Sequence, residues 1–200
     1  MYILGISGSP IKKGKVTILL NTVLEKAKEL GSETELVFLI DYPISYCMGC
    51  YSKDPMQCKP EVFKEMLPQL YEKIIRSDGI VFGTPVYWFG PSGLMKNFID
   101  LISALENIEP LLAGKVISCV VSGEEDGAAS AASSIIIPLN FMGAIIPPYA
   151  ITYAIGPIEE NLDVYEECER IAKNMVETIK RIREVEKIFW FRPLKKINES

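Results

Sequence analysis

A turn that combines glycine, hydroxyl and lysine residues follows the first apolar segment of the chain. It occupies residues 8–17 and reads GSPIKKGKVT. Between a strand and a helix, such a turn presents free backbone N–H groups at the helix N-terminus, where the helix dipole also favours an anion. The alternative is an ordinary polar connection with solvated lysine side chains. The side chains that could contact a phosphate group there are Ser7, Ser9, Lys12, Lys13, Lys15 and Thr17.

The spacing of this turn excludes two common phosphate-binding motifs. A P-loop needs Gly-Lys-Ser/Thr after a four-residue gap, and the dinucleotide motif needs GxGxxG. Residues 8–17 match neither pattern. A nucleoside triphosphatase is therefore disfavoured, and a phosphate of another ligand is left open.

Three consecutive aromatic residues, Tyr87, Trp88 and Phe89, follow a second apolar segment. They belong to the sequence GTPVYWFGPSGLMKNFIDLI at residues 83–102. Loops lie on the protein surface, so three aromatic side chains in a loop favour a site for a flat conjugated ring. Backbone N–H and C=O groups would contact the polar edge of that ring. A hydrophobic plug on the core or a subunit contact is the alternative.

Three of the five cysteines, Cys47, Cys50 and Cys58, lie close together in the sequence CMGCYSKDPMQC. The first two have a spacing that lets two thiolates reach one metal, but a [4Fe–4S] cluster normally needs four cysteine ligands. Cys119 is expected on a buried strand and Cys168 on a distant helix, so neither is an obvious fourth ligand. Three interpretations stay open: a cluster with a non-cysteine or external fourth ligand, a redox-active or incidental thiol pair, and a metal-free loop that shapes the active-site wall or a dimer contact. The metal-free loop is favoured.

The composition excludes several classes of chemistry. The chain of 200 residues has no histidine, which removes Ser-His-Asp and Cys-His catalytic units, histidine-ligated zinc and an imidazole proton switch. A net charge of -5 argues against nucleic acid as a partner. The apolar runs fall short of the ~20 residues that cross a bilayer, and no basic segment precedes the first one. A cytoplasmic location is therefore expected.

Apolar strand-like segments alternate with amphipathic helical segments along the chain. This alternation predicts an α/β protein with a parallel sheet covered by helices on both faces. Five strands in a chain of this length are typical of the flavodoxin-like doubly wound fold, in a single domain. The domain is expected to span residues 1–188, followed by an aromatic and basic tail at 189–200 that either folds back on the core or forms an oligomer contact. The expected strands are 2–7, 35–40, 79–83, 115–122 and 149–155, and the expected helices are 16–30, 61–77, 91–105, 135–142 and 159–188.

Three local features refine this expectation. Pro68 predicts a kink or break in the helix at 61–77, and Pro138 an interruption of the helix at 135–142. Residues 41–60 are expected to form a long irregular loop, since they contain three prolines, three cysteines and a glycine. Loops of that length usually have a function.

The turn at 8–17 and the segment at 83–102 together resemble the NADPH-dependent FMN reductase and iron–sulfur flavoprotein group of the flavodoxin-like superfamily. The family form has a GSPR-type phosphate loop, a CxGC loop and an SPVYW-type flavin loop. This sequence departs from it at Ile11, Lys15 and Val16, where the family has Arg, Asn and a small hydroxyl residue. Lysine lacks the bidentate geometry of arginine, so the departures bear on individual phosphate contacts.

The resemblance implies that FMN lies at the carboxyl edge of the sheet. The hydroxyl and lysine residues of the first turn would surround its phosphate, and the loop SGEEDG at 122–127 would close the pyrimidine side. The residues that would line the ring system are Pro85, Val86, Tyr87, Trp88, Phe89 and Gly90, and those of the closing loop are Ser122, Gly123 and Gly127.

The resemblance further implies an oxidoreductase that passes electrons from NAD(P)H through FMN to a quinone, flavin or similar small acceptor. The flavin would carry the chemistry, and no side chain is assigned a catalytic role. A homodimer or homotetramer is expected, because the flavin and cysteine loops at one edge would need shielding. An electron-transfer iron–sulfur flavoprotein and a non-catalytic flavin-binding sensor are the alternatives.

Overall fold

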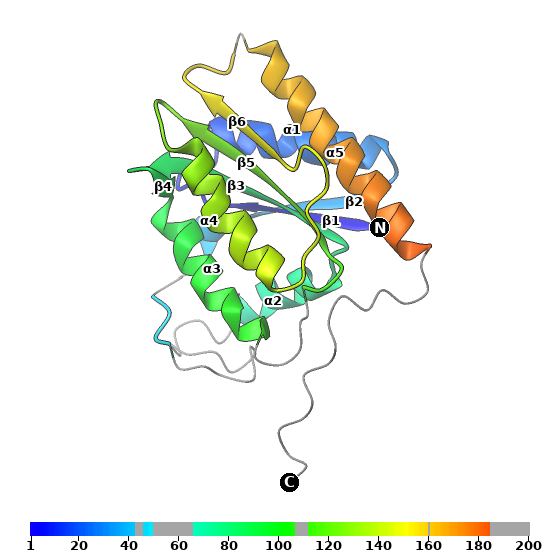
Figure 1. The fold of residues 1–200 in the computed structure, drawn as a ribbon. Coiled ribbons are helices and arrows are strands. Elements are labelled where there is room, and N and C mark those ends of the chain that lie inside the picture. Colours follow the sequence, from blue (N-terminus) through cyan, green and yellow to red (C-terminus); the bar gives the residue numbers. More distant parts are fainter. Residues whose placement is uncertain (43–45, 50–65, 107–111, 160, 185–200) are drawn as a thin grey trace.

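The computed structural model describes residues 1–42, 46–49, 66–106, 112–159 and 161–184 (Figure 1). Five parallel strands pair in the order β2-β1-β3-β5-β6. This topology confirms the predicted doubly wound five-stranded sheet. The strands are β1 (Tyr2–Ser7), β2 (Glu33–Phe38), β3 (Gly79–Tyr87), β5 (Val116–Gly123) and β6 (Ile151–Ile155), with a short β4 (Gly90–Pro91) that pairs only with β3.

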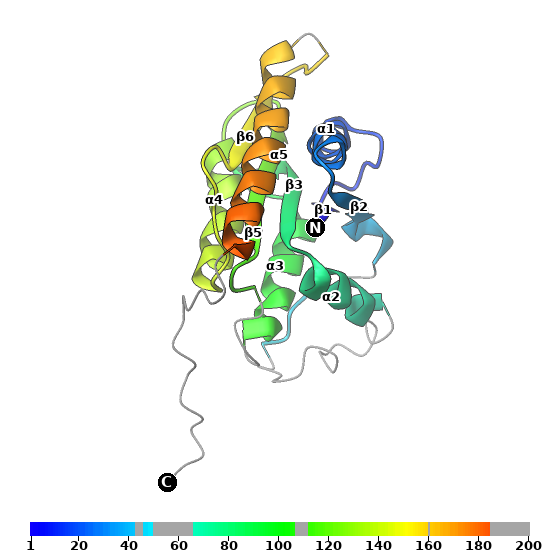
Figure 2. The same ribbon diagram turned by 90° about the vertical axis from the view of Figure 1, so that its right-hand side faces the viewer.

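Helices cover the sheet on both faces (Figures 1 and 2). Two of them, α1 (Lys15–Glu29) and α5 (Leu162–Arg183), lie side by side on one face. The opposite face is covered by α2 (Met66–Arg76), α3 (Gly93–Glu106) and α4 (Ala128–Phe141). A 3-10 turn at Leu39–Asp41 follows β2. No helix in these described ranges is long and apolar enough to cross a membrane.

The alternation of side chains along each strand builds two cores. In β1, Ile3 packs among α1 and α5 residues, whereas Leu4 and Ile6 pack against the α2, α3 and α4 layer. Every residue of β1 is buried, as expected for a parallel strand covered on both faces. This continuous burial explains why the apolar run at 2–7 predicted the strand bounds correctly.

The segment after the third strand differs from its prediction as a loop. β3 continues to Tyr87 and turns back through Trp88 and Phe89 into β4. Both turn residues have positive φ, 50° and 64°, which is the backbone of a two-residue hairpin turn whose twist matches the flanking strands. The aromatic residues therefore form the tip of a β-hairpin.

One of the two predictions about proline was wrong. Pro68 lies in α2 close to its first described residue, and the kink or break predicted there concerns residues 61–65, which lie outside the described residues. Pro138 lies inside α4, which continues to Phe141 because Ile135 and Leu139 are fully buried on either side of it. The same helix begins at Ala128, within the Gly/Ala/Ser-rich segment that was not predicted as helical.

Parts of several predictions lie outside the described residues. These parts are most of the loop at 41–60, the start of the helix predicted at 61–77, the end of the helix predicted to 188, and the tail at 189–200.

Candidate functional site

Three loops leave neighbouring strands at the carboxyl edge of the sheet. Ser7 at the end of β1 pairs with Gly83 of β3, and Pro85 of β3 pairs with Ser122 of β5. The loops that follow these three strands are therefore neighbours, at the left-hand edge of the sheet in Figure 1. Ligands of open α/β sheets bind at this edge.

The turn after β1 is tied directly to the segment after β3. The Gly8 N–H donates to the Gly83 carbonyl at 2.7 Å, and Ser92 Oγ donates to the Gly8 carbonyl at 2.5 Å. A Cβ atom at Gly8 would lie 2.7 Å from Met95 Cβ, so only glycine allows this approach. Two stretches far apart in the sequence thus share one hydrogen-bonded junction. Ser92, which the sequence analysis did not single out, is its central residue.

The β1–α1 turn contains polar groups that could contact an anion. Ser9 Oγ accepts from the Ile11 N–H at 3.1 Å, and Ser7 Oγ accepts from the Ser9 N–H at 3.3 Å. The N-cap of α1 is Gly14, which has no side chain to accept the N–H groups of the first helical turn. Thr17 Oγ1 is buried and has no hydrogen-bond partner among the described residues. Because buried polar groups are normally paired, this hydroxyl fits a ligand phosphate at the turn.

The lysines of the turn differ in what they contact. Lys15 Nζ bonds Glu124 Oε1 at 2.6 Å and the Gly156 carbonyl at 2.9 Å, which links the turn to the loops after β5 and β6. Lys12 Nζ lies 2.5 Å from Asp41 Oδ1. Lys13 is exposed. Part of the positive charge of the lysines in the turn is thus already paired with acidic side chains of neighbouring segments.

The aromatic hairpin is held in an unusual backbone conformation. Positive φ costs a bulky residue ~1–3 kcal/mol, and such strain persists where the surrounding structure enforces it. Trp88 is 95% exposed and Phe89 60% exposed, with their rings edge-to-face at 6.4 Å between centroids. Large apolar surface displayed on a strained turn indicates a binding function.

The loop after β5 contacts this hairpin through its glycines. A Cβ atom at Gly127 (φ +100°) would lie 2.7 Å from Phe89 Cα, and one at Gly123 would lie 3.1 Å from a methyl group of Val86. Ser122, at the end of the same strand, is buried. The turn at 8–17, the hairpin at 85–91 and the loop at 122–127 together form a candidate ligand site, which we call the carboxyl-edge site. The structure brings all three predicted segments together.

The structure describes Cys47, Cys119 and Cys168, of which the last two lie far from each other. Cys47 is exposed, and Cys50 and Cys58 lie outside the described residues. Cys119 and Cys168 are buried in cores on opposite faces of the sheet, so they cannot serve one metal together. Within the described ranges, no group of three His, Cys, Asp or Glu residues is placed to hold a metal ion.

The two buried thiols predict a loss of stability at alkaline pH. Burial raises the pKa of Cys119 and of Cys168 from 9.0 to about 12. Between these values the unfolded chain loses thiol protons that the folded chain keeps, so the free energy of unfolding falls as pH rises from 9 to 12. Each thiol contributes at most about 1.4 kcal/mol per pH unit. Urea unfolding between pH 9 and 11 should show a shallower decline for Cys119→Ala/Cys168→Ala, and equal slopes would contradict the prediction.

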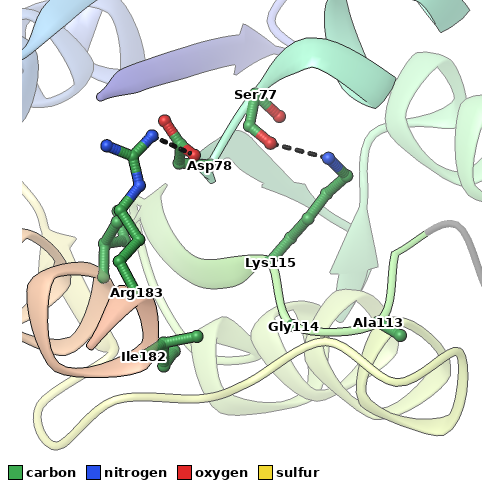
Figure 3. A pocket seen from close by; sticks show the side chains of 8 residues that line it. Ser77, Asp78, Ala113, Gly114, Lys115, Ile182 and Arg183 are labelled. Carbon is green, nitrogen blue, oxygen red and sulfur yellow. Dashed lines mark hydrogen bonds and ion pairs between the residues drawn. The ribbon is translucent and has the colours of Figure 1, made fainter. Parts of the chain in front are cut away.

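A pocket of about 270 Å³ lies at the opposite, amino edge of the sheet (Figure 3). Lys115 Nζ donates to the carbonyls of Ile75 and Ser77, both at 2.6 Å. The Asp78 carboxylate accepts from the Tyr2 N–H and from Arg183, both at 2.7 Å. Each of these polar groups already has a hydrogen-bond or ion-pair partner within the protein. We therefore interpret the pocket as the place where α2, β5 and α5 pack together and not as a ligand site. Burial lowers the pKa of Lys115 to about 8, and the Asp78 carboxylate opposes this shift.

Comparison with protein families and relatives gives a consistent result. The family described as NADPH-dependent FMN reductase matches residues 1–156. An iron-sulfur flavoprotein of Archaeoglobus fulgidus is 32% identical over 169 residues, which cover 80% of this chain and 81% of the relative. An NAD(P)H-dependent FAD/FMN reductase of Geobacillus thermodenitrificans is 32% identical over 105 residues, which cover 52% of each chain.

Solved structures share the fold. RosB with a bound 8-demethyl-8-formylriboflavin-5'-phosphate has a TM-score of 0.75 at 20% identity, covering 92% of this chain and 81% of that one. A WrbA-like flavodoxin from Agrobacterium tumefaciens has a TM-score of 0.62 at 15% identity, covering 90% and 98%. At these identities the likeness concerns the fold, which is flavodoxin-like as predicted.

Proposed function

The chain belongs to the NADPH-dependent FMN reductase family, and we propose that it holds FMN in the carboxyl-edge site and passes electrons from NAD(P)H to a small acceptor. As a family member it is a flavin-dependent oxidoreductase. The acceptor class proposed is a quinone, a free flavin or a similar conjugated molecule. The observation that carries the proposal is the Gly8–Ser92 junction, which joins the anion-binding turn to the aromatic hairpin.

The residues of the carboxyl-edge site fit FMN in chemistry and order. The turn offers the phosphate an unpaired buried hydroxyl at Thr17, the open N-terminus of α1 and nearby ammonium groups. The hairpin offers flat apolar surface for a ring, with backbone groups of Val86 and Gly90 beside it. The chemistry that bound FMN supplies is acceptance of a hydride from the nicotinamide and release of electrons to the acceptor.

The protein's own contribution is to bind and orient. The turn at 8–17 fixes the charged end of the cofactor, and the hairpin with Gly127 behind it fixes the plane of the ring. The exposed Trp88 and Tyr87 side chains lie where a second flat molecule could stack. No histidine is needed, because hydride transfer does not require an imidazole base. Lys15 holds the loops around the carboxyl-edge site in place, because its ammonium group joins the turn at 8–17 to Glu124 and to the Gly156 carbonyl.

The direct test of this function is reconstitution followed by turnover. Purified protein mixed with FMN should become yellow after removal of free flavin, and should then oxidise NADH or NADPH in the presence of a quinone. A protein that stays colourless after incubation with FMN would contradict the proposal. FMN bound without turnover of either nicotinamide would instead favour a flavin-binding sensor.

Replacement of Thr17 tests the phosphate half of the site. Thr17→Val removes the unpaired hydroxyl with little change of shape, and a hydrogen bond to a charged group is worth ~1.5–3 kcal/mol. We expect FMN to bind about 10- to 100-fold more weakly, with no change for riboflavin, which has no phosphate. Fluorescence titration with both flavins measures the two affinities. The control is Thr22→Val on the same helix, whose exposed hydroxyl donates to the Ile18 carbonyl. Equal losses for both flavins would refute the assignment.

A second candidate function rests on the names of the relatives and on the cysteine loop. Several relatives are named iron-sulfur flavoproteins, and three cysteines have a suitable spacing at residues 47–58. Cys119 and Cys168 do not supply the fourth ligand, since both are buried elsewhere. Iron and sulfide analysis after anaerobic purification separates an electron-transfer iron–sulfur flavoprotein from the proposed reductase.

A further inference from the structure

The first peptide bond of the β1–α1 turn is held by hydrogen bonds on both sides. Its carbonyl, which belongs to Gly8, accepts from Ser92 Oγ at 2.5 Å, and its N–H, which belongs to Ser9, donates to Ser7 Oγ at 3.3 Å. The Gly8 N–H donates to the Gly83 carbonyl at 2.7 Å. Backbone N–H groups of a turn before a helix are the groups that bind an anion. The orientation of this turn at its start is therefore set by β3 and the segment after it.

Ser92 also closes the base of the aromatic hairpin. It lies between β4 and α3 (Figure 1) and is 1% exposed. Its N–H donates to Thr84 Oγ1 at 3.0 Å, and the fully buried Thr84 donates to the Pro85 carbonyl at 3.0 Å. Thr84 and Ser92 stand at the two ends of the hairpin at 85–91. One buried residue thus holds both the turn after β1 and the hairpin after β3.

A helix cap alone does not account for these contacts of Ser92. As the residue before α3, Ser92 accepts from the Met95 N–H at 3.1 Å through Oγ, and serine is a common N-cap. Capping needs only an acceptor, whereas this hydroxyl also donates to Gly8, 84 positions away. The fit around it is tight, because a Cβ atom at Gly8 would lie 2.7 Å from Met95 Cβ and 3.2 Å from Ser92 Oγ. These contacts keep the turn and the hairpin at one separation.

A ligand with two binding groups on one short connection depends on that separation. The second group adds affinity only where the two subsites lie at the distance that the ligand spans, and a preorganised site avoids the cost of ordering them. FMN carries a phosphate at one end and a flat ring at the other. In the proposed function the phosphate belongs to the turn at 8–17 and the ring to the hairpin at 85–91. Residues that fix the distance between these segments therefore bear on FMN more than on either of its parts.

We propose that Ser92 is a positioning residue that fixes the separation of the turn and the hairpin, and thereby selects a flavin with a phosphate over a flavin without one. Ser92 is buried and is assigned no contact with the cofactor, since it acts through Gly8 and Thr84. The inference rests on the proposed function, to which it adds the residue that sets selectivity for the phosphorylated flavin. Its role differs from that of Thr17, which is proposed to contact the phosphate itself.

Comparison of FMN with its two parts tests the proposal. Ser92→Ala removes the hydrogen bond to Gly8 and should weaken FMN binding about tenfold, which corresponds to the loss of one buried hydrogen bond. Riboflavin, which uses only the hairpin, and inorganic phosphate, which uses only the turn, should each keep their affinity within about twofold. Fluorescence titration gives the affinities of the two flavins, and competition with FMN gives the affinity of inorganic phosphate. Thr17→Val, by contrast, should weaken both FMN and inorganic phosphate.

A second variant and a matched control separate positioning from folding. Thr84→Val removes the acceptor of the Ser92 N–H but leaves the cap of α3 in place, and it should also weaken FMN binding while sparing riboflavin. Asn161→Ala removes the cap of α5, where the Asn161 side chain accepts from the Val164 N–H at 3.3 Å. This control should leave the ratio of FMN affinity to riboflavin affinity unchanged. Thermal unfolding measures the stability of all three variants, and Thr84→Val decides the test if Ser92→Ala does not fold.

Three results would overturn the role of Ser92. They are an unchanged ratio of FMN affinity to riboflavin affinity in Ser92→Ala and Thr84→Val, an equal fall of this ratio in Asn161→Ala, and a loss of inorganic phosphate affinity that matches the loss for FMN. In each case the natural protein still binds FMN, so the proposed function stands. A natural protein that binds neither flavin would contradict the proposed function, and this inference with it.

Discussion

Gly127→Ala is expected to weaken FMN binding by about tenfold or more while the sheet stays folded. A Cβ atom at this position would lie 2.7 Å from Phe89 Cα and 3.1 Å from a methyl group of Val86. The clash is with backbone, so the hairpin itself must move. Its two turn residues already have positive φ and have little freedom to adjust. The hairpin residues proposed to hold the ring would lose their position.

The matched control is Gly31→Ala. Gly31 has a φ of +88°, close to the +100° of Gly127, but a Cβ atom there would meet nothing within 4 Å. Both variants carry the same left-handed backbone penalty of ~1 kcal/mol, and only Gly127→Ala disturbs the hairpin. Flavin fluorescence quenching gives the affinity, and thermal unfolding gives the stability of each variant. Equal FMN affinities of the two variants would contradict the role given to the β5 loop.

The largest loss of stability is expected for Lys115→Met. Methionine keeps the length of the side chain but cannot donate to the carbonyls of Ile75 and Ser77, which end α2. A buried acceptor left without a partner costs ~1–3 kcal/mol. The free energy of unfolding should therefore fall by about 2–3 kcal/mol, a large fraction of the stability of a domain this size.

Urea unfolding at neutral pH measures this loss. Lys28→Met is the control, because Lys28 is exposed on α1, and surface substitutions of this kind usually change stability by less than ~0.5 kcal/mol. FMN affinity should be unchanged in Lys115→Met, since the amino-edge pocket lies at the far end of the strands from the carboxyl-edge site. A stability equal to that of the control would show that water replaces the ammonium at no cost.

The sequence predicted the fold because its central strands β1, β3 and β5 are buried on both faces over all or most of their length. Continuous apolar runs such as residues 2–7 and 115–122 have one plausible structure in a chain that alternates them with amphipathic helices. The helix α4 was partly missed, because the apolar positions Ala128, Ala131 and Ala132 of the segment AASAASS have helical spacing but are small and lie among serines and a further alanine. Its helical structure comes from packing of Ala128, Ala131 and Ala132 on the sheet, which is a tertiary effect.

The sequence predicted which segments of the chain form the candidate site, but it did not predict which side chains contact one another within it. Parallel strands must present their carboxyl ends at one edge, so the convergence of the turn and the aromatic segment followed from topology. The partners of individual side chains did not. Lys15 meets Glu124 across 109 positions of sequence, and Ser92 meets Gly8 across 84. Such pairs depend on the backbone path of two loops that are distant in sequence, and the sequence pattern within either loop does not predict that path.

Backbone hydrogen exchange with and without saturating FMN tests the central claim, that two distant stretches of the chain hold one flavin. The account predicts that FMN slows exchange in both the turn at 8–17 and the hairpin at 85–91, with no change at Ser77, Asp78 or Lys115. Protection confined to one of the two stretches, or protection at the amino-edge pocket, would contradict it.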